Sequence, residues 1–243
     1  SDLYYSEDPL LTGKIGAAMV NGVESNGVGT TIKHYFGNNS ETNRNQINDI
    51  GEPRTFREIY LRGFHRAVVE SQPWTVMCSY NRINGVYASE DPWLLTDVLR
   101  GEWGFEGLVV SDWGAVNDRV AGVSAGLDLE MPYSGGYNDR QIVKAVQEGR
   151  LDEAVLDEAV ERVLNVVFAG EEQHRPEVIS DKETDHKKAA DIETECAVLL
   201  ENNGILPLNT DRKVAYIGEF AEKPRYQGGG SSHINPFRVV SAL

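Results

Sequence analysis

Apolar positions in the first 149 residues alternate between a helical period and short unbroken runs. The helical period is clearest in an early stripe that consists of Leu11, Ile15, Ala18, Met19 and Val23. Short apolar runs bounded by turn residues are typical of buried strands. Four such runs predict strands at residues 28–34, 74–80, 107–111 and 123–131, and the last is the weakest because a glycine interrupts it.

Helix signals lie between these runs. Thr55 and Glu58 form a capping-box pattern, and the apolar positions after them have helical spacing. Asp91 and Pro92 provide an N-cap and a first-turn residue for another helix, and residues 139–147 predict a third. Strands that alternate with helices in this way predict an α/β fold with a parallel sheet and right-handed crossovers.

Polar or aromatic side chains follow each predicted strand. They are Lys33 and His34, Tyr80 and Asn81, Asp112 and Trp113, and Glu130 and Met131. In a (β/α)8 barrel these strand ends share one face, where active sites lie. An open doubly wound sheet would bring only two of them to one crevice. We favour the barrel and keep the open sheet as the alternative. Because a barrel usually takes ~250 residues, residues 1–149 are expected to be its C-terminal half.

The pattern changes after residue 149. The predicted features are a helix, a polar linker, a second helix, a strand and a glycine-rich loop, at residues 155–167, 170–179, 180–200, 214–218 and 228–233. A capping box of Ser180 and Glu183 marks the start of the second helix. We expect residues 150–210 to be a helical linker region and residues 211–243 to begin a second α/β domain.

Charge and composition exclude several classes of partner. The 243 residues include 23 Lys and Arg against 38 Asp and Glu, which gives a net charge of −15. Nucleic acids and anionic membranes attract basic surfaces, so neither is expected to bind. Apolar runs fall short of the ~18 residues of a membrane span. The start of the chain has no signal-peptide pattern, so a soluble and cytoplasmic protein is slightly favoured over a secreted one, and the compartment stays open.

The cysteines and histidines predict no metal site or cofactor. Cys78 and Cys196 lie in apolar stretches, where buried thiols are expected. The His and Cys spacings match no metal-binding pattern.

Asp112 is the strongest candidate for chemistry. It follows a Leu-Val-Val run at the exit of a predicted buried strand. An acid in this position is costly unless it is paired or functional. Beside Trp113, which offers a flat apolar surface to a sugar ring, Asp112 could act as a carboxylate nucleophile. The alternative is that Asp112 is the N-cap of the next helix.

Other candidates follow the first two predicted strands. Lys33 and His34 could bind sugar hydroxyls or phosphate, or be an exposed Lys and a structural His. Arg44 lies in a long polar loop that suits binding or plain exposure to solvent. Tyr80 could bond to a nucleophilic carboxylate or be structural, and Met77 taken alone is a core residue.

Several segments together resemble a known family. They are Lys33-His34, Glu41-Thr42-Asn43-Arg44, Cys78-Ser79-Tyr80-Asn81, Gly107-Leu108-Val109-Val110-Ser111-Asp112-Trp113, Gly126-Leu127-Asp128-Leu129-Glu130-Met131-Pro132, Ala215-Tyr216-Ile217-Gly218 and Gly230-Ser231-Ser232-His233. In this order they resemble the β-glucosidases of glycoside hydrolase family 3. The resemblance implies a barrel, a linker and an α/β sandwich domain that starts within residues 211–243. It also implies retaining hydrolysis of terminal non-reducing β-D-glucosyl residues of oligosaccharides or β-glucosides.

The resemblance also assigns roles to residues. Asp112 matches the nucleophile, and Tyr80 matches the residue beside it. The other matches are binding residues: Lys33, His34 and Arg44 for sugar hydroxyls, Met77 and Trp113 for the lining of the site, and Ser231 on a sandwich-domain loop. The family's acid/base is a Glu deeper in the second domain, so we expect activity to need the remainder of the polypeptide or an associated fragment. The alternatives are a β-xylosidase or α-arabinofuranosidase of the same family and a non-catalytic sugar-binding relative.

Overall fold

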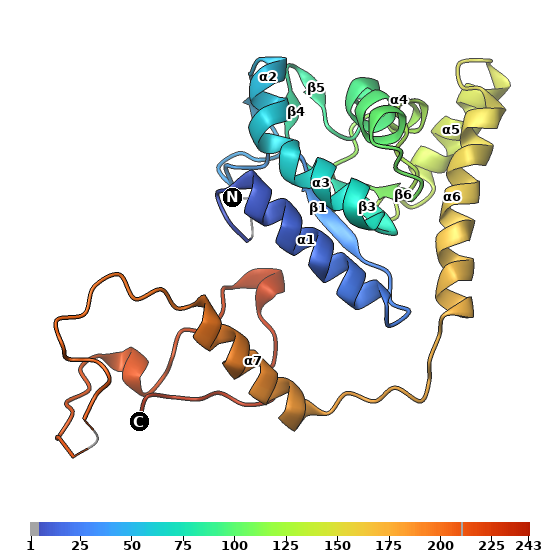
Figure 1. Ribbon diagram of the computed structural model, residues 1–243. Coiled ribbons are helices and arrows are strands. Elements are labelled where there is room, and N and C mark those ends of the chain that lie inside the picture. Colours follow the sequence, from blue (N-terminus) through green and yellow to red (C-terminus); the bar gives the residue numbers. More distant parts are fainter. Residues whose placement is uncertain (1–4, 210) are drawn as a thin grey trace. The chain divides into compact units, whose positions relative to one another are not determined.

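The computed structural model describes residues 5–209 and 211–243 and divides into two compact units at Arg175 (Figure 1). The first unit contains α1 (Pro9–Glu24), β1 (Thr31–Tyr35), β2 (Asn48–Asp49), α2 (Pro53–Thr55), η1 (Phe56–Tyr60), α3 (Arg62–Ser71), β3 (Thr75–Cys78), β4 (Arg82–Ile83), β5 (Val86–Tyr87), η2 (Trp93–Glu102), β6 (Leu108–Val110), α4 (Arg119–Ala125), α5 (Tyr137–Gln147) and α6 (Glu153–Glu172). The second contains α7 (Lys182–Cys196), η3 (Glu219–Ala221) and η4 (Gly230–Ser232).

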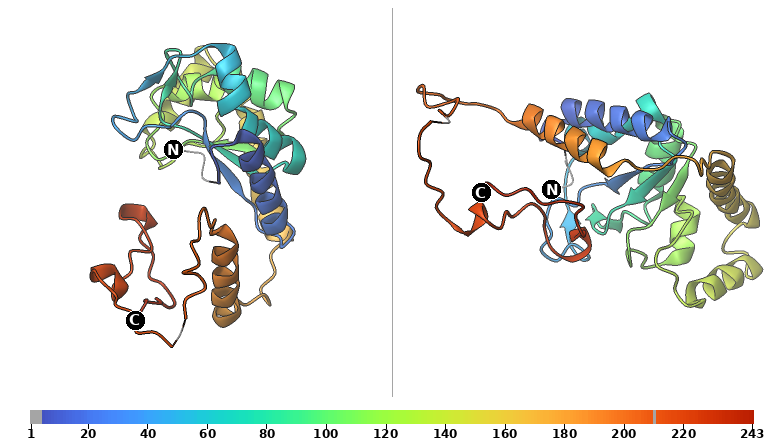
Figure 2. Two further views of the ribbon diagram at one scale, coloured as in Figure 1. Left: turned by 60° about the vertical axis from the view of Figure 1, so that its left-hand side comes forward. Right: turned by 90° about the horizontal axis from the view of Figure 1, so that it is seen from below.

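The main sheet is parallel, as the alternation of strands and helices predicts. Its order is β1-β3-β6, with Thr31 opposite Thr75 and Val76 opposite Val109. The helical segment from α2 to α3 connects β1 to β3, and η2 connects β3 to β6. Helices α1 and α3 pack together on one face of β1 (Figures 1 and 2). The carboxyl ends of the three strands therefore lie at one edge of the sheet.

The predicted fourth strand, residues 123–131, is wrong for most of its length. Residues up to 125 belong to α4, which ends at Gly126 in the left-handed conformation (φ 106°). Only Leu129 forms a bridge, parallel to Val110. The Arg119 side chain donates hydrogen bonds to the carbonyls of residues 127 and 128.

A small second sheet was not predicted. Its order is β2-β4-β5, with β2 parallel to β4 and β4 antiparallel to β5. Each of these strands is two residues long, which is too short for an apolar alternation to show in the sequence. Asn84 and Gly85 turn the chain between β4 and β5 with φ values of 48° and 97°.

Two of the three predicted helix starts are wrong. The helical segment over residues 53–71 begins at Pro53, so Thr55 lies inside its first turn and caps nothing. Asp181, rather than Ser180, is the N-cap of α7. The Asp91 prediction is confirmed, because its Oδ1 accepts hydrogen bonds from the backbone N–H of Trp93 and Leu94 at 3.0 and 3.4 Å.

The core lies between the main sheet and the helices that connect its strands. Its fully buried members include Tyr35, Val76, Leu94, Leu99 and Val109. The Tyr35 ring packs edge-on against Phe64 and Trp103. Burial of each Leu or Val stabilises the fold by about 1.5–3 kcal/mol, so this core fixes the strand ends in place.

The second unit has helical turns but no strand among its described residues, 176–209 and 211–243. Residues 214–218, predicted as a strand, form no strand, and Ile217 is 94% exposed. Cys196 is exposed, contrary to the prediction of a buried thiol, whereas Cys78 is buried as predicted. Along the described parts of both units, every helix is too short or too polar to cross a membrane.

Candidate active site

Three side chains predicted from different strand ends meet at the carboxyl edge of the main sheet. The His34 Nε2 lies 3.2 Å from Asp112 Oδ2. The Tyr80 hydroxyl donates a hydrogen bond of 2.9 Å to the carbonyl of Trp113. The order β1-β3-β6 brings these residues together, because His34, Tyr80 and Asp112 lie at or just beyond the ends of those three strands.

Asp112 is buried and does not cap a helix. Its Oδ1 accepts a 2.7 Å hydrogen bond from the N–H of Trp113, and its residue exposure is 8%. The cap of α4 is Asp118, whose Oδ1 accepts from Val120 and Ala121. The alternative of Asp112 as a helix N-cap is therefore wrong. Contacts on both oxygens fix the orientation of the carboxylate.

Tyr80 lies beside this carboxylate. Burial raises the pKa of the Tyr80 phenol, and the negative charge of Asp112 raises it further. The phenol therefore keeps its proton at neutral pH and can donate a hydrogen bond. Arg44 stacks over the Tyr80 ring at 4.5 Å and pairs with Glu41 at 2.9 Å, which places the polar loop after β1 against the site.

The remaining candidates occupy different positions. Lys33 is an exposed residue of β1. Met77 is a nearly buried residue of β3 opposite Val110, and Trp113 is 54% exposed. Ser231 belongs to η4 of the second unit, and its side chain lies outside the described part of the structure.

Cys78 lies beneath the nucleophile candidate. Its thiol is fully buried, and burial raises its pKa to about 12. The backbone of Asp112 hydrogen-bonds to this thiol. The sequence predicts the burial of Cys78 but not its contact with Asp112, because the contact depends on the pairing of β3 with β6.

Sequence reasoning also missed a buried ionic network below β6. Asp128, whose carboxylate is fully buried, accepts hydrogen bonds from Arg100 at 2.7 Å, Arg162 at 3.0 Å and the N–H of Val109 at 2.7 Å. These contacts connect η2, α6 and β6. The only sequence signal is an acid inside an apolar run, a pattern that predicts a strand rather than an ionic network. In the described residues, no three His, Cys, Asp or Glu side chains are placed to hold a metal ion.

Comparison with known proteins agrees with this architecture. Residues 2–166 match the family described as glycosyl hydrolase family 3 N terminal domain. The chain is 50% identical over 237 residues to thermostable beta-glucosidase B of Acetivibrio thermocellus, covering 97% of this chain and 31% of that protein. It is 48% identical over 255 residues to an exo-alpha-(1->6)-L-arabinopyranosidase of Bifidobacterium breve, covering 99% of this chain and 33% of the relative.

Solved structures give the same picture. A GH3 beta-glucosidase of Bifidobacterium adolescentis is similar with a TM-score of 0.92 and 47% identity, over 97% of this chain and 35% of that one. Beta-glucosidase 3B of Thermotoga neapolitana in complex with glucose is similar with a TM-score of 0.92 and 42% identity, over 99% of this chain and 35% of that one. The chain spans about a third of the length of these relatives. Because the family match covers well over half of its residues, the chain belongs to glycosyl hydrolase family 3.

Proposed function

We propose that this chain supplies the nucleophile of a retaining β-glucosidase, and that Asp112 is that nucleophile. The observation that carries the proposal is the state of the Asp112 carboxylate. It is buried at a strand end, held on both oxygens, and adjacent to the exposed ring of Trp113. Relatives named as beta-glucosidases, one of them solved with glucose, support the substrate class.

The reaction follows from the needs of retaining hydrolysis. The Asp112 carboxylate attacks the anomeric carbon while a second carboxyl group, ~5–5.5 Å away across the scissile bond, protonates the leaving oxygen. The glycosidic bond breaks and a glucosyl ester forms on Asp112. Water, deprotonated by the second carboxylate, then releases glucose with retained configuration. We assign the second carboxyl group to a Glu outside this chain.

The sugar contacts are assigned by position. Lys33, His34 and Arg44 would donate hydrogen bonds to hydroxyl groups, and Met77 and Trp113 would line the sugar ring. Ser231 would contribute from the second unit. Tyr80 would orient the backbone beside Asp112 through its bond to the Trp113 carbonyl.

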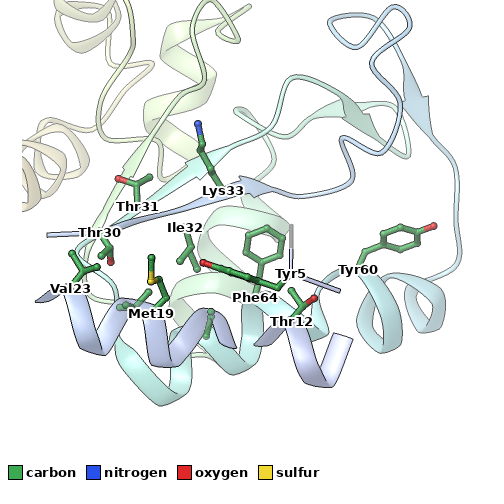
Figure 3. A pocket seen from close by; sticks show the side chains of 14 residues that line it. Tyr5, Thr12, Met19, Val23, Thr30, Thr31, Ile32, Lys33, Tyr60 and Phe64 are labelled. Carbon is green, nitrogen blue, oxygen red and sulfur yellow. The ribbon is translucent and has the colours of Figure 1, made fainter. Parts of the chain in front are cut away.

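We also propose that residues 1–149 are the C-terminal half of a (β/α)8 barrel, followed by a helical linker region at 150–210 and the start of a sandwich domain at 211–243. An apolar cavity of about 520 Å³ supports the half-barrel (Figure 3). It lies between α1, α3 and the outer edge of β1, with Met19 and Ile32 turned into it and Lys33 projecting away. A strand before α1 would pair with this edge through a right-handed crossover. The remainder of the polypeptide, or an associated fragment, would supply that strand.

The test is covalent labelling by a 2-fluoro-β-glucoside with a good leaving group, which needs no acid catalyst. We expect the intact mass of the longer polypeptide to rise by one fluoroglucosyl unit, on the peptide that contains Asp112. Asp112→Asn should prevent labelling and retain glucose binding. A label on another residue, or full turnover by Asp112→Asn, would refute the assignment. Glucose binding by a folded protein that takes no label would favour the sugar-binding alternative.

A second substrate class has one specific observation in its favour, the 48% identity to an arabinopyranosidase. Comparing kcat/KM for nitrophenyl β-glucoside, β-xyloside, α-L-arabinofuranoside and α-L-arabinopyranoside decides between them. The proposal expects the glucoside to be preferred.

A further inference from the structure

The segment between β6 and α4 carries both Asp112 and Trp113 and is folded into a turn. The N–H of Ala115 donates a 3.1 Å hydrogen bond to the carbonyl of Asp112, and the N–H of Gly114 donates one of 2.9 Å to the carbonyl of Met131. The Trp113 N–H that binds Asp112 Oδ1 is part of the same turn. The orientation of the carboxylate therefore depends on the conformation of this segment, residues 112–118.

Two consecutive side chains from a different part of the chain hold the far side of the turn. Glu90 Oε1 accepts hydrogen bonds from the N–H groups of Asn117 and Asp118, at 3.0 and 2.6 Å. Ser89, which is fully buried, donates its hydroxyl to the carbonyl of Ala115 at 3.0 Å. We call these two residues the 89–90 clamp.

The clamp is itself fixed to the core. The next residue, Asp91, caps η2 through bonds to its first N–H groups, and Leu94 and Leu95 of η2 are fully buried. On the other side, the carbonyl of Ser89 approaches Gly122 of α4 so closely that an added Cβ would lie 3.2 Å from it. The clamp thus connects a rigid helix start to the turn that carries the nucleophile candidate.

We propose that Ser89 and Glu90 are positioning residues, which hold residues 112–118 so that Asp112 faces the anomeric carbon. The inference rests on the proposed role of Asp112. We assign Glu90 the role of a hydrogen-bond acceptor, since its Oε1 makes both of its contacts to the turn. A glutamine at this position can make the same two contacts, whereas a methionine of similar length can make neither.

The experiment compares Glu90→Gln, Glu90→Met and Ser89→Ala in the longer polypeptide, with Glu58→Met as a matched control. Glu58 is exposed and pairs with Arg54 one turn away on its own helical segment. The readouts are the rate of labelling by the 2-fluoro-glucoside and the Kd for glucose. Misplacement of a reacting group by about 1 Å can cost about 100-fold in rate.

We expect Glu90→Met to slow labelling by about 10- to 100-fold while the Kd for glucose stays within about threefold. Ser89→Ala should show a smaller loss in the same direction, and Glu90→Gln and Glu58→Met should label at the unaltered rate. Equal loss in Glu90→Gln and Glu90→Met would overturn the acceptor role. So would an unchanged rate in Glu90→Met.

Hydrogen exchange separates this inference from the proposed function. In Glu90→Met, the amides of Trp113 and Ala115 should exchange at least tenfold faster than in Glu90→Gln, whether or not Asp112 is the nucleophile. Unchanged exchange of these amides overturns the clamp. Failure of the unaltered protein to take the label counts against the proposed function alone. If Glu90→Met does not fold, the exchange comparison is made with Ser89→Ala, which removes only one hydroxyl.

Discussion

Replacing Asp128 by alanine should destabilise the first unit more than any single surface charge does. The Asp128 carboxylate is fully buried and accepts hydrogen bonds from Arg100, Arg162 and the backbone of Val109. Burial raises the pKa of Asp128 and lowers the pKa of Arg100, both against the direction that pairing favours. The desolvation of these charges therefore offsets much of their attraction.

The magnitude follows from what the substitution leaves behind. Removing one partner of a buried ionic group costs about 3–5 kcal/mol, because the other charge stays buried and unpaired. Here Arg100 keeps bonds to the carbonyls of Gly107 and Gly126, and Arg162 keeps Glu158. The free energy of unfolding should therefore fall by about 3 kcal/mol, the lower limit of that range. With a urea m-value of about 2 kcal/mol per M, the unfolding midpoint falls by about 1.5 M.

Tryptophan fluorescence is the appropriate probe, because all four tryptophans belong to the first unit. The matched control is Glu102→Ala, which breaks the surface pair with Arg57 and should cost at most about 1 kcal/mol. Asp128→Asn keeps a hydrogen-bond acceptor, so its loss in the free energy of unfolding should lie between the losses of the other two variants. A loss for Asp128→Ala no larger than that for Glu102→Ala would refute the reasoning.

Three other predictions concern single groups. Burial raises the pKa of Tyr35 well above 10, so Tyr35 ionises near pH 10 only in the unfolded chain. The urea midpoint should therefore fall between pH 9 and pH 11, and Tyr35→Phe should flatten that fall. Tyr80→Phe removes the hydroxyl that bonds to the Trp113 carbonyl and to the Asp112 side chain. Losing a hydrogen bond to a neutral carbonyl is worth about 0.5–1.5 kcal/mol, so 2-fluoro-glucoside labelling should slow at least about two- to tenfold, and an unchanged rate would contradict the prediction. A thiol reagent at pH 8 should modify Cys196 in the folded protein and Cys78 only in denaturant, as measured by peptide mass. Equal modification of both cysteines in the folded protein would contradict the burial of Cys78.

The sequence predicts β3 and β6 well because nearly all of their residues are buried. The runs around Val76 and Val109 are apolar without interruption, and their positions agree with β3 and β6 within a few residues. The Asp91 cap was also predictable, since capping uses only local contacts. Asp91 forms the predicted hydrogen bonds, so a helix cap can be read from the sequence where a neighbouring side chain binds the backbone N–H groups.

The failures have a common physical cause, which is that distant groups decide the local structure. The segment after Gly126 pairs with β6 at Leu129, and the Arg119 side chain of α4 binds the carbonyls of residues 127 and 128. Residues 214–218 have strand composition, but the described residues of their unit, 176–209 and 211–243, include no strand for them to pair with. The β4–β5 turn at Asn84 and Gly85 is a recognisable hairpin signal, and it is the one feature of the small sheet that could have been predicted.

For the site, strand order predicts which side chains share an edge but not how they touch. Lys33, His34, Tyr80 and Asp112 all follow or end strands of one parallel sheet, so their common edge follows from topology. The contact of His34 with Asp112 and the stacking of Arg44 on Tyr80 depend on side-chain conformations that no periodicity encodes.

The turn after β6 shows why residues remote from any sugar can control the chemistry of this fold. Asp112 sits on a segment whose backbone is held by Tyr80 from the end of β3, by Ser89 and Glu90 before η2, and by the carbonyl of Met131. The contacts made by Ser89, Glu90 and Met131 do not involve the Asp112 carboxylate, so changing them can alter its orientation without changing its charge. Tyr80 also bonds to the Asp112 side chain itself. Substitutions there should alter the rate of attack at the anomeric carbon and leave ground-state binding nearly intact. A loss confined to glucose affinity would mean that the turn serves the binding site and not the nucleophile.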